Sequence, residues 1–418
     1  MGMTVDAKLE NALAGESIVC FAGEDWWYHH PHSKNHLLKR YALRNKVLFV
    51  NSITMGLPSM ANPDFFLKIR RKLKSYLRWL RKVPEGLWVM TPVNLPFYGS
   101  RIGRWLNRIL LVAQLRVAML LLGISRPILW VAIPTAAEMA GRLGEKLLLY
   151  QVSDKYDANQ DSALSAQVIR RYDRQLKDAA DVVLYSGRKL FRESTEPHRF
   201  FLEQAVDFDH FSNLRVEPAP ELEGIPHPIL GYFGTMDYVM DTELMAEVAR
   251  LRPGWHWVLL GLKSNLVRIS APNIHFLGSK PYRDLPRYIR QFDVCVLPWR
   301  ETNTFTSYGS AIKVREYLAT GKPVVMAPLY EYLETPGLRF YRGTQEFIAQ
   351  VEAALQENSP ALAAQRQAVV KDGTWDERAS QLAALIQSLL RGRRYTYQAT
   401  HSGGPHAATV PAAVLEGH

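Results

Sequence analysis

Residues 310–325 read SAIKVREYLATGKPVV, and this run decides the fold expected for the whole 418-residue chain. A loop that enters a helix at about Ala311 exposes backbone N–H groups at the positive end of a helix dipole, which suits a diphosphate. Lys313 in the first turn adds a cation, and Glu316, one turn further on, can accept both hydroxyls of a ribose. Gly321-Lys-Pro ends the helix and starts a strand. An ordinary amphipathic helix with Lys and Glu on its solvated face is the alternative interpretation.

Short apolar runs alternate with amphipathic stretches on both sides of this segment. Apolar runs spaced by helices predict parallel sheets that are covered on both faces. Strands are expected at residues 18–22, 47–50, 87–90, 128–131, 147–150, 181–184, 229–233, 255–260, 274–277, 294–297 and 323–326. Helical periodicity is found at residues 36–43, 103–122 and 163–176. The pattern predicts an α/β protein with two Rossmann-like, doubly wound parallel-sheet domains facing a cleft.

The chain length also requires two domains, because 47.6 kDa is too large for one ordinary core. A Pro-rich and acid-rich segment separates the two series of strands. The expected divisions are a first domain at residues 1–216, a linker at 217–228, a second domain at 229–374, a C-terminal helix at 375–392 and a disordered tail at 393–418. Cys20 and Cys295 each lie in an apolar run, which predicts two buried thiols in a reducing compartment.

Residues 310–325 resemble the donor-binding signature of group 1 glycosyltransferases with the GT-B fold, which carry a similar Pro-x-Lys-x-x-Glu-Tyr-Leu-Ala-x-Gly-x-Pro-Val-Val run. Other landmarks of that family follow in the same order along the chain. They are ADVVLYS at residues 180–186, AVDFDHF at 205–211, GYFGTMD at 231–237, NIHFLGSKPY at 273–282 and DVCVLPW at 293–299. The resemblance covers roughly residues 17–390, and the order of its motifs along the chain is more specific than any single motif.

The resemblance implies a glycosyltransferase that takes a sugar from a nucleoside diphosphate donor, expected to be a UDP-sugar, without a metal or other cofactor. The second domain would bind the donor, and the first would bind a lipid-linked or membrane-proximal saccharide acceptor in polysaccharide or glycolipid synthesis. The residues implied in donor binding are Gly234, Thr235, Lys263, Gly278, Ser279, Ser310, Ala311, Ile312, Lys313 and Glu316.

Two departures from the family pattern weigh against a retaining mechanism. The family places an acid eight residues before Glu316, where this chain has Tyr308, and it places cations early in the second domain, where Gly234-Thr-Met-Asp has none. Lys263 is the candidate substitute, and an exposed lysine that only contacts solvent is the alternative. Asp154 resembles the catalytic base of inverting glucuronosyltransferases of the exopolysaccharide or teichuronic-acid type, since one base takes the acceptor proton in an inverting transfer. A helix N-cap is the alternative role for Asp154.

The segment GEDWWYHHPH at residues 23–32 follows the first strand and combines aromatic with polar side chains, which suits stacking on a sugar ring. It makes Asp25, Trp26 and His29 candidates for acceptor binding. Packing of the tryptophans into the core is the alternative. A zinc site at these histidines is not favoured, because no cysteine or carboxylate stands at ligand spacing.

The net charge of +11 is concentrated at residues 65–137, which hold thirteen Lys or Arg and one acid. Residues 66–82 place apolar residues at helical spacing beneath eight cations, the pattern of a helix lying on an anionic membrane. These cations are Lys68, Arg70, Arg71, Lys72, Lys74, Arg78, Arg81 and Lys82. A solvated basic helix is the alternative.

The apolar run at residues 109–124 is short for a membrane span and carries Gln114 and Arg116, so a buried helix is expected there. Residues 1–17 are polar and lack a signal-peptide pattern. The expected location is therefore the cytoplasm, at the inner face of the cell membrane.

Two other function classes share features with this sequence. A nucleotide-sugar epimerase of the same fold would need additional acid and base groups around the sugar and no basic membrane helix. A nucleic-acid-binding protein is suggested by charge alone, but the cations alternate with aliphatic residues where stacked aromatics would be expected. No nucleic-acid partner is therefore predicted.

Overall fold

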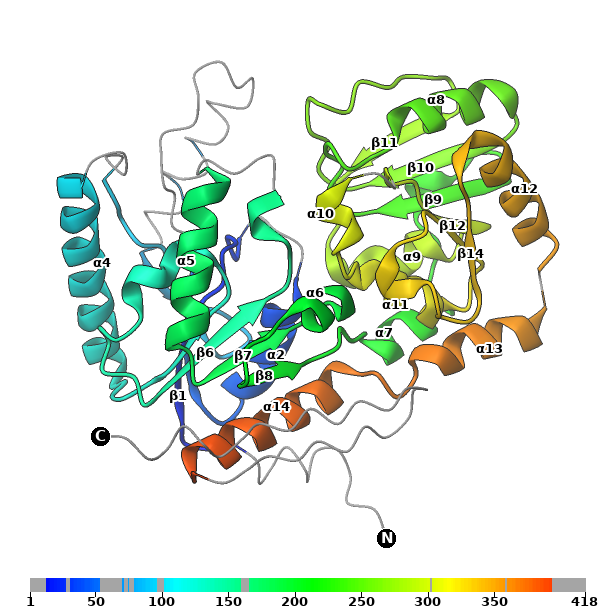
Figure 1. The fold of residues 1–418 in the computed structure, drawn as a ribbon. Helices are drawn as coiled ribbons and strands as arrows, with labels where there is room; N and C mark the ends of the chain where they lie inside the picture. Colours follow the sequence, from blue (N-terminus) through cyan, green and yellow to red (C-terminus); the bar gives the residue numbers. More distant parts are fainter. Residues whose placement is uncertain are drawn as a thin grey trace, which may run out of the picture. The chain divides into compact units, whose positions relative to one another are not determined.

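The computed structural model describes residues 13–27, 31–52, 70, 74, 79–95, 101–158, 165–300, 303–357 and 359–392. The chain forms two compact α/β units (Figure 1). The first unit comprises Met1–Glu203 with Asp376–His418, and the second comprises Gln204–Trp375. Each unit is built on one sheet, of eight strands in the first and six in the second. The predicted fold of two doubly wound parallel-sheet units is confirmed.

The sheet of the first unit has the strand order β3-β4-β2-β1-β5-β6-β7-β8. Its strands pair in parallel except for β3, which runs antiparallel to β4 at the edge. The strands are β1 (Ser17–Phe21), β2 (Lys46–Val50), β3 (Leu80–Lys82), β4 (Trp88–Met90), β5 (Ile128–Val131), β6 (Leu147–Val152), β7 (Val182–Tyr185) and β8 (Arg199–Phe201).

The central strands of this sheet are apolar on both faces, as expected when helices cover both sides. Every residue of β5 and β7 is buried. In the parallel register, Val19 of β1 lies between Leu48 of β2 and Leu129 of β5. The helical elements of the unit are α2 (Ser33–Ala42), α4 (Arg101–Leu122), η1 (Pro134–Met139), η2 (Tyr156–Ala158), α5 (Ala166–Ala179), α6 (Arg188–Glu193) and α14 (Trp375–Leu390).

The sheet of the second unit is parallel throughout, in the order β11-β10-β9-β12-β13-β14. Its strands are β9 (Ile229–Phe233), β10 (His256–Leu260), β11 (Ile274–Gly278), β12 (Val294–Leu297), β13 (Val324–Met326) and β14 (Leu338–Phe340). The helical elements are α7 (Phe208–Ser212), η3 (Pro220–Leu222), α8 (Thr242–Leu251), η4 (Tyr282–Asp284), α9 (Leu285–Ile289), α10 (Thr304–Ser307), α11 (Ile312–Thr320), η5 (Tyr330–Tyr332), α12 (Gly343–Leu355) and α13 (Pro360–Val370).

The border between the units differs from the expected one. The segment at residues 217–228 was expected to be a linker, but Ala219 and Leu222 are 2% exposed and belong to the core of the second unit, together with Val206 and Phe211. Apolar side chains within the Pro-rich stretch hold it against that core. The N-terminal segment of the first unit therefore ends at Glu203, and the second unit begins at Gln204.

The C-terminal helix α14 packs on the first unit and is not a separate element. Arg40 of α2 makes two hydrogen bonds to the Asp376 carboxylate, at 2.6 and 3.0 Å. The Tyr41 hydroxyl donates to the backbone oxygen of Ala379 at 2.8 Å. The two ends of the chain thus build one unit.

The basic segment at residues 66–82 is only partly described. Arg70 and Lys74 are helical and exposed, while Arg81 and Lys82 are exposed residues of the strand β3, which corrects the expectation that the helix continues through them. Pairing with β4 supplies the backbone hydrogen bonds that a helix would otherwise have made. Lys68, Arg71, Lys72 and Arg78 lie outside the described residues.

Candidate functional site

The second unit has a topological switch point between β9 and β12. From β9 the chain proceeds to β10 and β11 on one side, and from β12 to β13 and β14 on the other. Doubly wound sheets bind ligands beyond the carboxyl ends of the strands at such a point. Gly234 follows β9 there, Trp299 lies just beyond β12, and α11 begins after the loop that leaves β12.

Helix α11 starts and ends where the sequence predicted. Ala311 is its N-cap, with no side-chain cap, and Gly321 closes it in the left-handed conformation with φ +76°. The first N–H groups of a helix have no partner within it and favour an anion. The sequence places Lys313 in the first turn of this helix, and no acidic residue is present in that turn.

The Lys313 ammonium lies at the end of β9. Its Nζ donates to the Tyr232 hydroxyl at 3.1 Å and sits over the rings of Tyr232 and Trp299, at 4.7 and 5.0 Å from their centroids. A Cβ added to Gly234 would meet this Nζ at 2.3 Å. The Lys313 ammonium therefore lies against the glycine backbone at the switch point. This arrangement lets a diphosphate approach both the cation and the backbone closely.

A second glycine allows the strand ends to meet. Gly261, at the end of β10, has φ +143°, and a Cβ there would lie 2.0 Å from the backbone oxygen of Gly234. The Gly261 N–H donates to the oxygen of Gly278 at 2.9 Å, which joins the ends of β10 and β11. Only glycine satisfies both the positive φ and the close approach at residue 261.

Glu316 is a buried carboxyl, 5% exposed, one turn beyond Lys313. Burial raises its pKa to about 7, although a hydrogen bond from Tyr282 and the charge of Lys313 act to lower it; Asp207 raises it further. Tyr282 stacks at 5.0 Å on His210. Because the Glu316 carboxyl is buried, water supplies it with few hydrogen bonds. Its oxygens are therefore suited to accept hydrogen bonds from ligand hydroxyls.

The other residues implied in donor binding divide into two groups. Ala311 and Ile312 begin α11, and the buried Oγ of Ser310 has no hydrogen-bond partner in the described part of the chain. Gly278, with φ +70°, ends the edge strand β11. Thr235, Lys263 and Ser279 are exposed. The Thr235 oxygen accepts a bond from the Tyr232 hydroxyl at 2.8 Å, and Lys263 Nζ lies 3.8 Å from the centroid of the Phe276 ring.

In the first unit, Asp154 comes directly after β6 at the carboxyl edge of the sheet. Burial raises its pKa above the ordinary value; the charge of Lys34 lowers that pKa and the charge of Glu24 raises it. None of the described residues makes a hydrogen bond to its carboxylate, so the capping alternative has no contact to support it. The neighbouring Asp157, by contrast, is ion-paired with Arg170 at 3.2 Å.

Asp154 also lines a cavity of about 710 Å³ in the first unit, together with Tyr156, Asp157, Arg174 and Lys177. The volume falls within the range of about 300–1,000 Å³ that ligand sites commonly have. The Tyr156 hydroxyl donates to the oxygen of Ala132 at 2.9 Å, which ties this edge to the end of β5. The cavity is lined by both acids and cations, and it suits a polar ligand.

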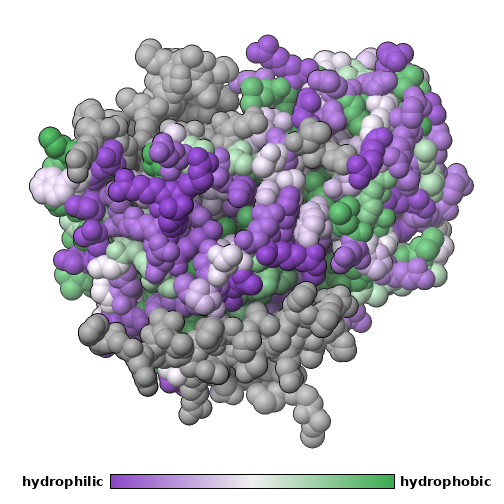
Figure 2. All heavy atoms as spheres, viewed as in Figure 1, coloured by the Kyte–Doolittle hydropathy of each residue, from purple (hydrophilic) through white to green (hydrophobic). Residues whose placement is uncertain are grey.

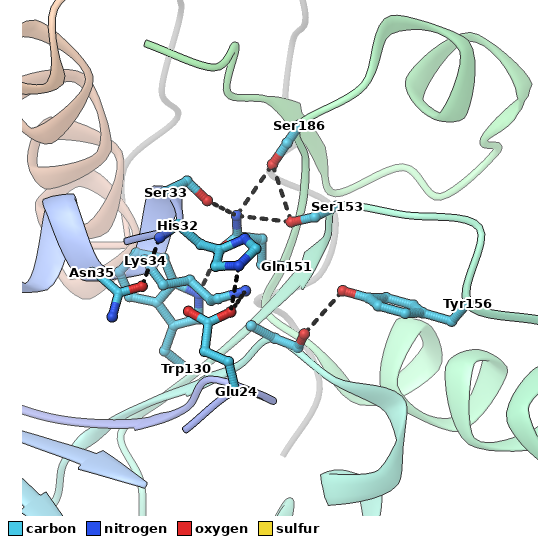
Figure 3. Close-up of polar contacts among 11 residues, drawn as sticks. Glu24, His32, Ser33, Lys34, Asn35, Trp130, Gln151, Ser153, Tyr156 and Ser186 are labelled. Carbon is cyan, nitrogen blue, oxygen red and sulfur yellow. Dashed lines mark hydrogen bonds and ion pairs between the residues drawn. The ribbon is translucent and has the colours of Figure 1, made fainter. Parts of the chain in front are cut away.

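Two buried charges near Asp154 were not identified from the sequence. Glu24 follows β1, and Lys34 lies in the first turn of α2; Lys34 Nζ is 3.4 Å from Glu24 Oε2, and both side chains are at most 9% exposed (Figure 3). His32 Nε2 lies 3.8 Å from the same oxygen. The buried Oε1 of Glu24 has no hydrogen-bond partner among the described residues. Glu24 adjoins the predicted Asp25, but only the fold brings Lys34 to it.

A polar network continues from this pair across the strand ends. The side-chain nitrogen of Gln151 lies within hydrogen-bonding distance of the hydroxyls of Ser33, Ser153 and Ser186, at 3.1–3.2 Å (Figure 3). Its oxygen accepts from Trp130 Nε1 at 3.0 Å. These contacts fix the start of α2 against the ends of β6 and β7, so the polar groups around Asp154 are held in place.

The predicted acceptor residues have structural partners. Asp25 Oδ1 accepts a bond from the backbone N–H of Trp27 at 2.9 Å. The Trp26 ring packs edge-on against Phe49, with centroids 5.0 Å apart, and Lys39 Nζ lies 5.4 Å from its centroid. This is the core-packing alternative for Trp26. His29 lies outside the described residues.

Cys20 and Cys295 are buried and unpaired, as predicted. Burial raises the pKa of Cys295 to about 12 and raises that of Cys20 as well. Among the described residues, no group of three or more His, Cys, Asp or Glu could hold a metal ion.

The buried Glu316 carboxyl makes stability depend on pH. Its pKa is about 7 in the folded chain and near the ordinary 4.5 when unfolded, so between these values the folded chain keeps a proton that the unfolded chain loses. We predict that the free energy of unfolding of the second unit falls by about 3 kcal/mol as pH rises through this window. In Glu316→Gln this loss should be absent. Urea unfolding at pH values on both sides of this window measures the difference, with Glu352→Gln, at an exposed residue of α12, as the control. Equal pH dependence in wild type and Glu316→Gln would contradict the prediction.

Two doubly wound units, the second with a cation and a helix N-terminus at its switch point, define a protein of the GT-B fold. Solved structures of that fold align over nearly the whole chain. Sucrose-phosphate synthase of Thermosynechococcus elongatus has a TM-score of 0.66 at 14% identity, covering 90% of this chain and 99% of that one. HepE of Anabaena, in complex with UDP and glucose, has a TM-score of 0.61 at 14% identity, with the same coverage of each chain.

Residues 227–357, in the second unit, match the family described as "Glycosyl transferases group 1", and the chain as a whole has the GT-B fold. A relative, TuaH of Bacillus subtilis strain 168, whose name assigns it to teichuronic acid biosynthesis, is 24% identical over 267 residues. That alignment covers 56% of this chain and 65% of the relative, slightly less than two thirds of its length.

Proposed function

We propose that this protein transfers a sugar from a nucleoside diphosphate sugar, specifically a UDP-sugar, to the hydroxyl of a saccharide acceptor. The observation that carries the proposal is the Lys313 ammonium held against Gly234 at the switch point, with the buried Glu316 one turn away on the same helix. The ammonium and the N-terminus of α11 would bind the diphosphate, and Glu316 would accept the ribose hydroxyls. HepE, a protein of the same fold, is solved with UDP-glucose, which supports this donor class.

The donor site needs no metal in this proposal. Lys313 and the helix dipole already provide positive potential where the leaving diphosphate gathers charge. Donor binding is therefore expected to be unchanged in the presence of a chelator.

For the transfer step we propose inversion, with Asp154 as the general base. The acceptor oxygen attacks the anomeric carbon, its proton passes to the Asp154 carboxylate, and the sugar–phosphate bond breaks to release the nucleoside diphosphate. Two observations support this assignment: no described residue hydrogen-bonds the Asp154 carboxylate, and Tyr308 occupies the position of the acid used in the retaining pattern.

The acceptor class is proposed from the relative and from charge. TuaH belongs by name to teichuronic acid biosynthesis, which is polysaccharide assembly. The basic residues at 65–137 suit a lipid-linked saccharide presented at an anionic membrane surface. We therefore place the protein in the cytoplasm, at the inner face of the membrane.

The test has two parts. Calorimetric titration with nucleoside diphosphates, with and without chelator, should show UDP binding above the other bases and no effect of the chelator. Chromatography of labelled UDP-sugars incubated without acceptor then separates transferase from epimerase: a transferase leaves the sugar intact or hydrolyses it slowly, whereas an epimerase yields a second nucleotide sugar. Failure of every nucleoside diphosphate to bind, or a new nucleotide sugar, would overturn the proposal.

A further inference from the structure

Helix α4 presents an unusual surface. Its sequence was expected to give a buried helix, but only one of its faces is buried, through Leu111, Leu115, Ala118 and neighbouring residues. The opposite face is exposed and apolar apart from Arg116, and we call its apolar members the α4 stripe. Its members and their exposed fractions are Ile102 (72%), Trp105 (51%), Leu106 (41%), Ile109 (47%), Val117 (49%), Leu120 (81%) and Leu121 (65%).

The members of the stripe recur every three or four residues within 102–109 and within 117–121, and the exposed Ala113 lies on the same face between these two groups. Figure 2 shows hydrophobic surface along the edge of the first unit where Figure 1 draws α4. Single exposed leucines are ordinary on soluble proteins, but a contiguous apolar band of this kind marks an interaction site.

The helix is attached to its unit by polar contacts along its length. Asn107 exchanges two hydrogen bonds with the backbone of Leu95, at 2.6 and 2.9 Å. Gln114 does the same with Val93, at 2.9 and 2.7 Å. Of the described helices, α4 is long and apolar enough to cross a membrane. Leaving the unit to do so would break these four bonds, so a position flat against a surface fits the contacts better.

Charge identifies the kind of surface. The helix carries Arg101, Arg104, Arg108 and Arg116 and no acidic residue. Arg104 and Arg108 are half-buried and border the stripe on the side of the exposed Ile102, Trp105 and Ile109. A band of aliphatic residues with a tryptophan and flanking cations is the composition of an interfacial helix on anionic lipid.

A second copy of the chain fits the stripe less well. In a symmetric dimer the same face meets itself, so the arginines of one helix would approach those of the other without any acid on either helix. Anionic headgroups, by contrast, neutralise these cations while the acyl chains receive the apolar side chains.

We propose that the α4 stripe docks the protein on an anionic lipid bilayer, with α4 lying in the plane of the membrane interface. The proposal moves membrane contact from residues 66–82, where the sequence placed it, to a helix with a described exposed face. It does not depend on the donor site or on the chemistry of transfer.

The test is co-sedimentation of the full chain with vesicles of phosphatidylcholine alone or mixed with phosphatidylglycerol. Wild type should bind the mixed vesicles more tightly than the neutral ones, and less tightly in high salt. The α4 triple variant, Ile102→Gln/Leu120→Gln/Leu121→Gln, should bind the mixed vesicles at least about tenfold more weakly, because three apolar side chains no longer enter the bilayer. Arg108→Gln/Arg116→Gln should weaken binding to mixed vesicles roughly tenfold and change binding to neutral vesicles little.

The matched control removes three exposed leucines elsewhere, in Leu43→Gln/Leu266→Gln/Leu333→Gln, and should bind vesicles like wild type. Thermal unfolding and UDP titration confirm that each variant is folded. Brominated lipid should quench the tryptophan fluorescence of wild type more strongly than that of Trp105→Phe. Unchanged vesicle binding in the α4 triple variant, or equal loss in the control, would overturn the proposal. So would a wild-type dimer that the triple variant turns into a monomer while vesicle binding persists, since the stripe would then face a second copy.

Discussion

The Glu316→Ala variant is expected to lose at least about a hundredfold in affinity for UDP while remaining folded. Two charge-assisted hydrogen bonds from the ribose to this carboxylate disappear. Removing a buried carboxyl whose pKa is raised to about 7 also relieves its burial penalty, so stability should not suffer near neutral pH. Isothermal titration measures the affinity, with Glu352→Ala, an exposed acid on α12, as the control.

A comparison of UDP with 2′-deoxy-UDP identifies what Glu316 contacts. Wild type should prefer the ribonucleotide, and Glu316→Ala should bind the two alike, because the partner of the 2′-hydroxyl is gone. Lys313→Ala should weaken both ligands together and keep the preference, because it removes a cation that faces phosphate. A preference that survives in Glu316→Ala would show that the carboxyl does not hold the ribose.

The affinity for UDP should also depend on pH in a defined direction. Only the ionised carboxyl accepts two hydroxyls, and burial raises the pKa of Glu316 to about 7. Affinity should therefore rise as pH increases through 7 and level off above it. In Glu316→Gln this dependence should vanish.

The Asp154→Asn variant is expected to lose about a hundredfold to ten-thousandfold in transfer rate, with UDP-sugar affinity unchanged. The amide keeps the shape of the side chain but cannot take the acceptor proton. Asp157→Asn is the matched control, since it is the neighbouring acid on the same cavity and is paired with Arg170. The transfer rate of Asp157→Asn should differ from that of wild type by less than about tenfold. Comparable losses in the two variants would indicate a general effect on the cavity and exclude a base role for Asp154.

The pH profile provides an independent measure of the same group. Transfer should fall on the acidic side as Asp154 takes up a proton, at a pKa above the ordinary range of aspartate because of burial. The neighbouring charges act in opposite directions. Lys34→Met should move this limb to higher pH, and Glu24→Gln should move it to lower pH. An acid limb that neither substitution moves would belong to a different group.

Local sequence signals were sufficient for most of the fold. Strands such as β5 and β9 were found because a strand covered on both faces is an unbroken apolar run, and α11 was delimited because Gly321 can adopt the left-handed conformation that ends it. The strands β3, β8 and β14 were missed. Each is only three residues long with half-exposed or exposed positions, so its pattern is too short to distinguish from a loop.

The sequence by itself determined the two doubly wound units, the helix that begins at Ile312 and the candidate donor residues Lys313 and Glu316, because these depend on periodicity and helix ends. Only the tertiary structure decided which groups meet. It brought Lys313 to Tyr232, 81 positions away in the chain, and Gln151 to Ser33, 118 positions away. It also turned one apolar face of α4 outward. Helical spacing fixes which residues share a face, but which face packs on the sheet depends on partners, such as Val93 and Leu95, that lie elsewhere in the chain.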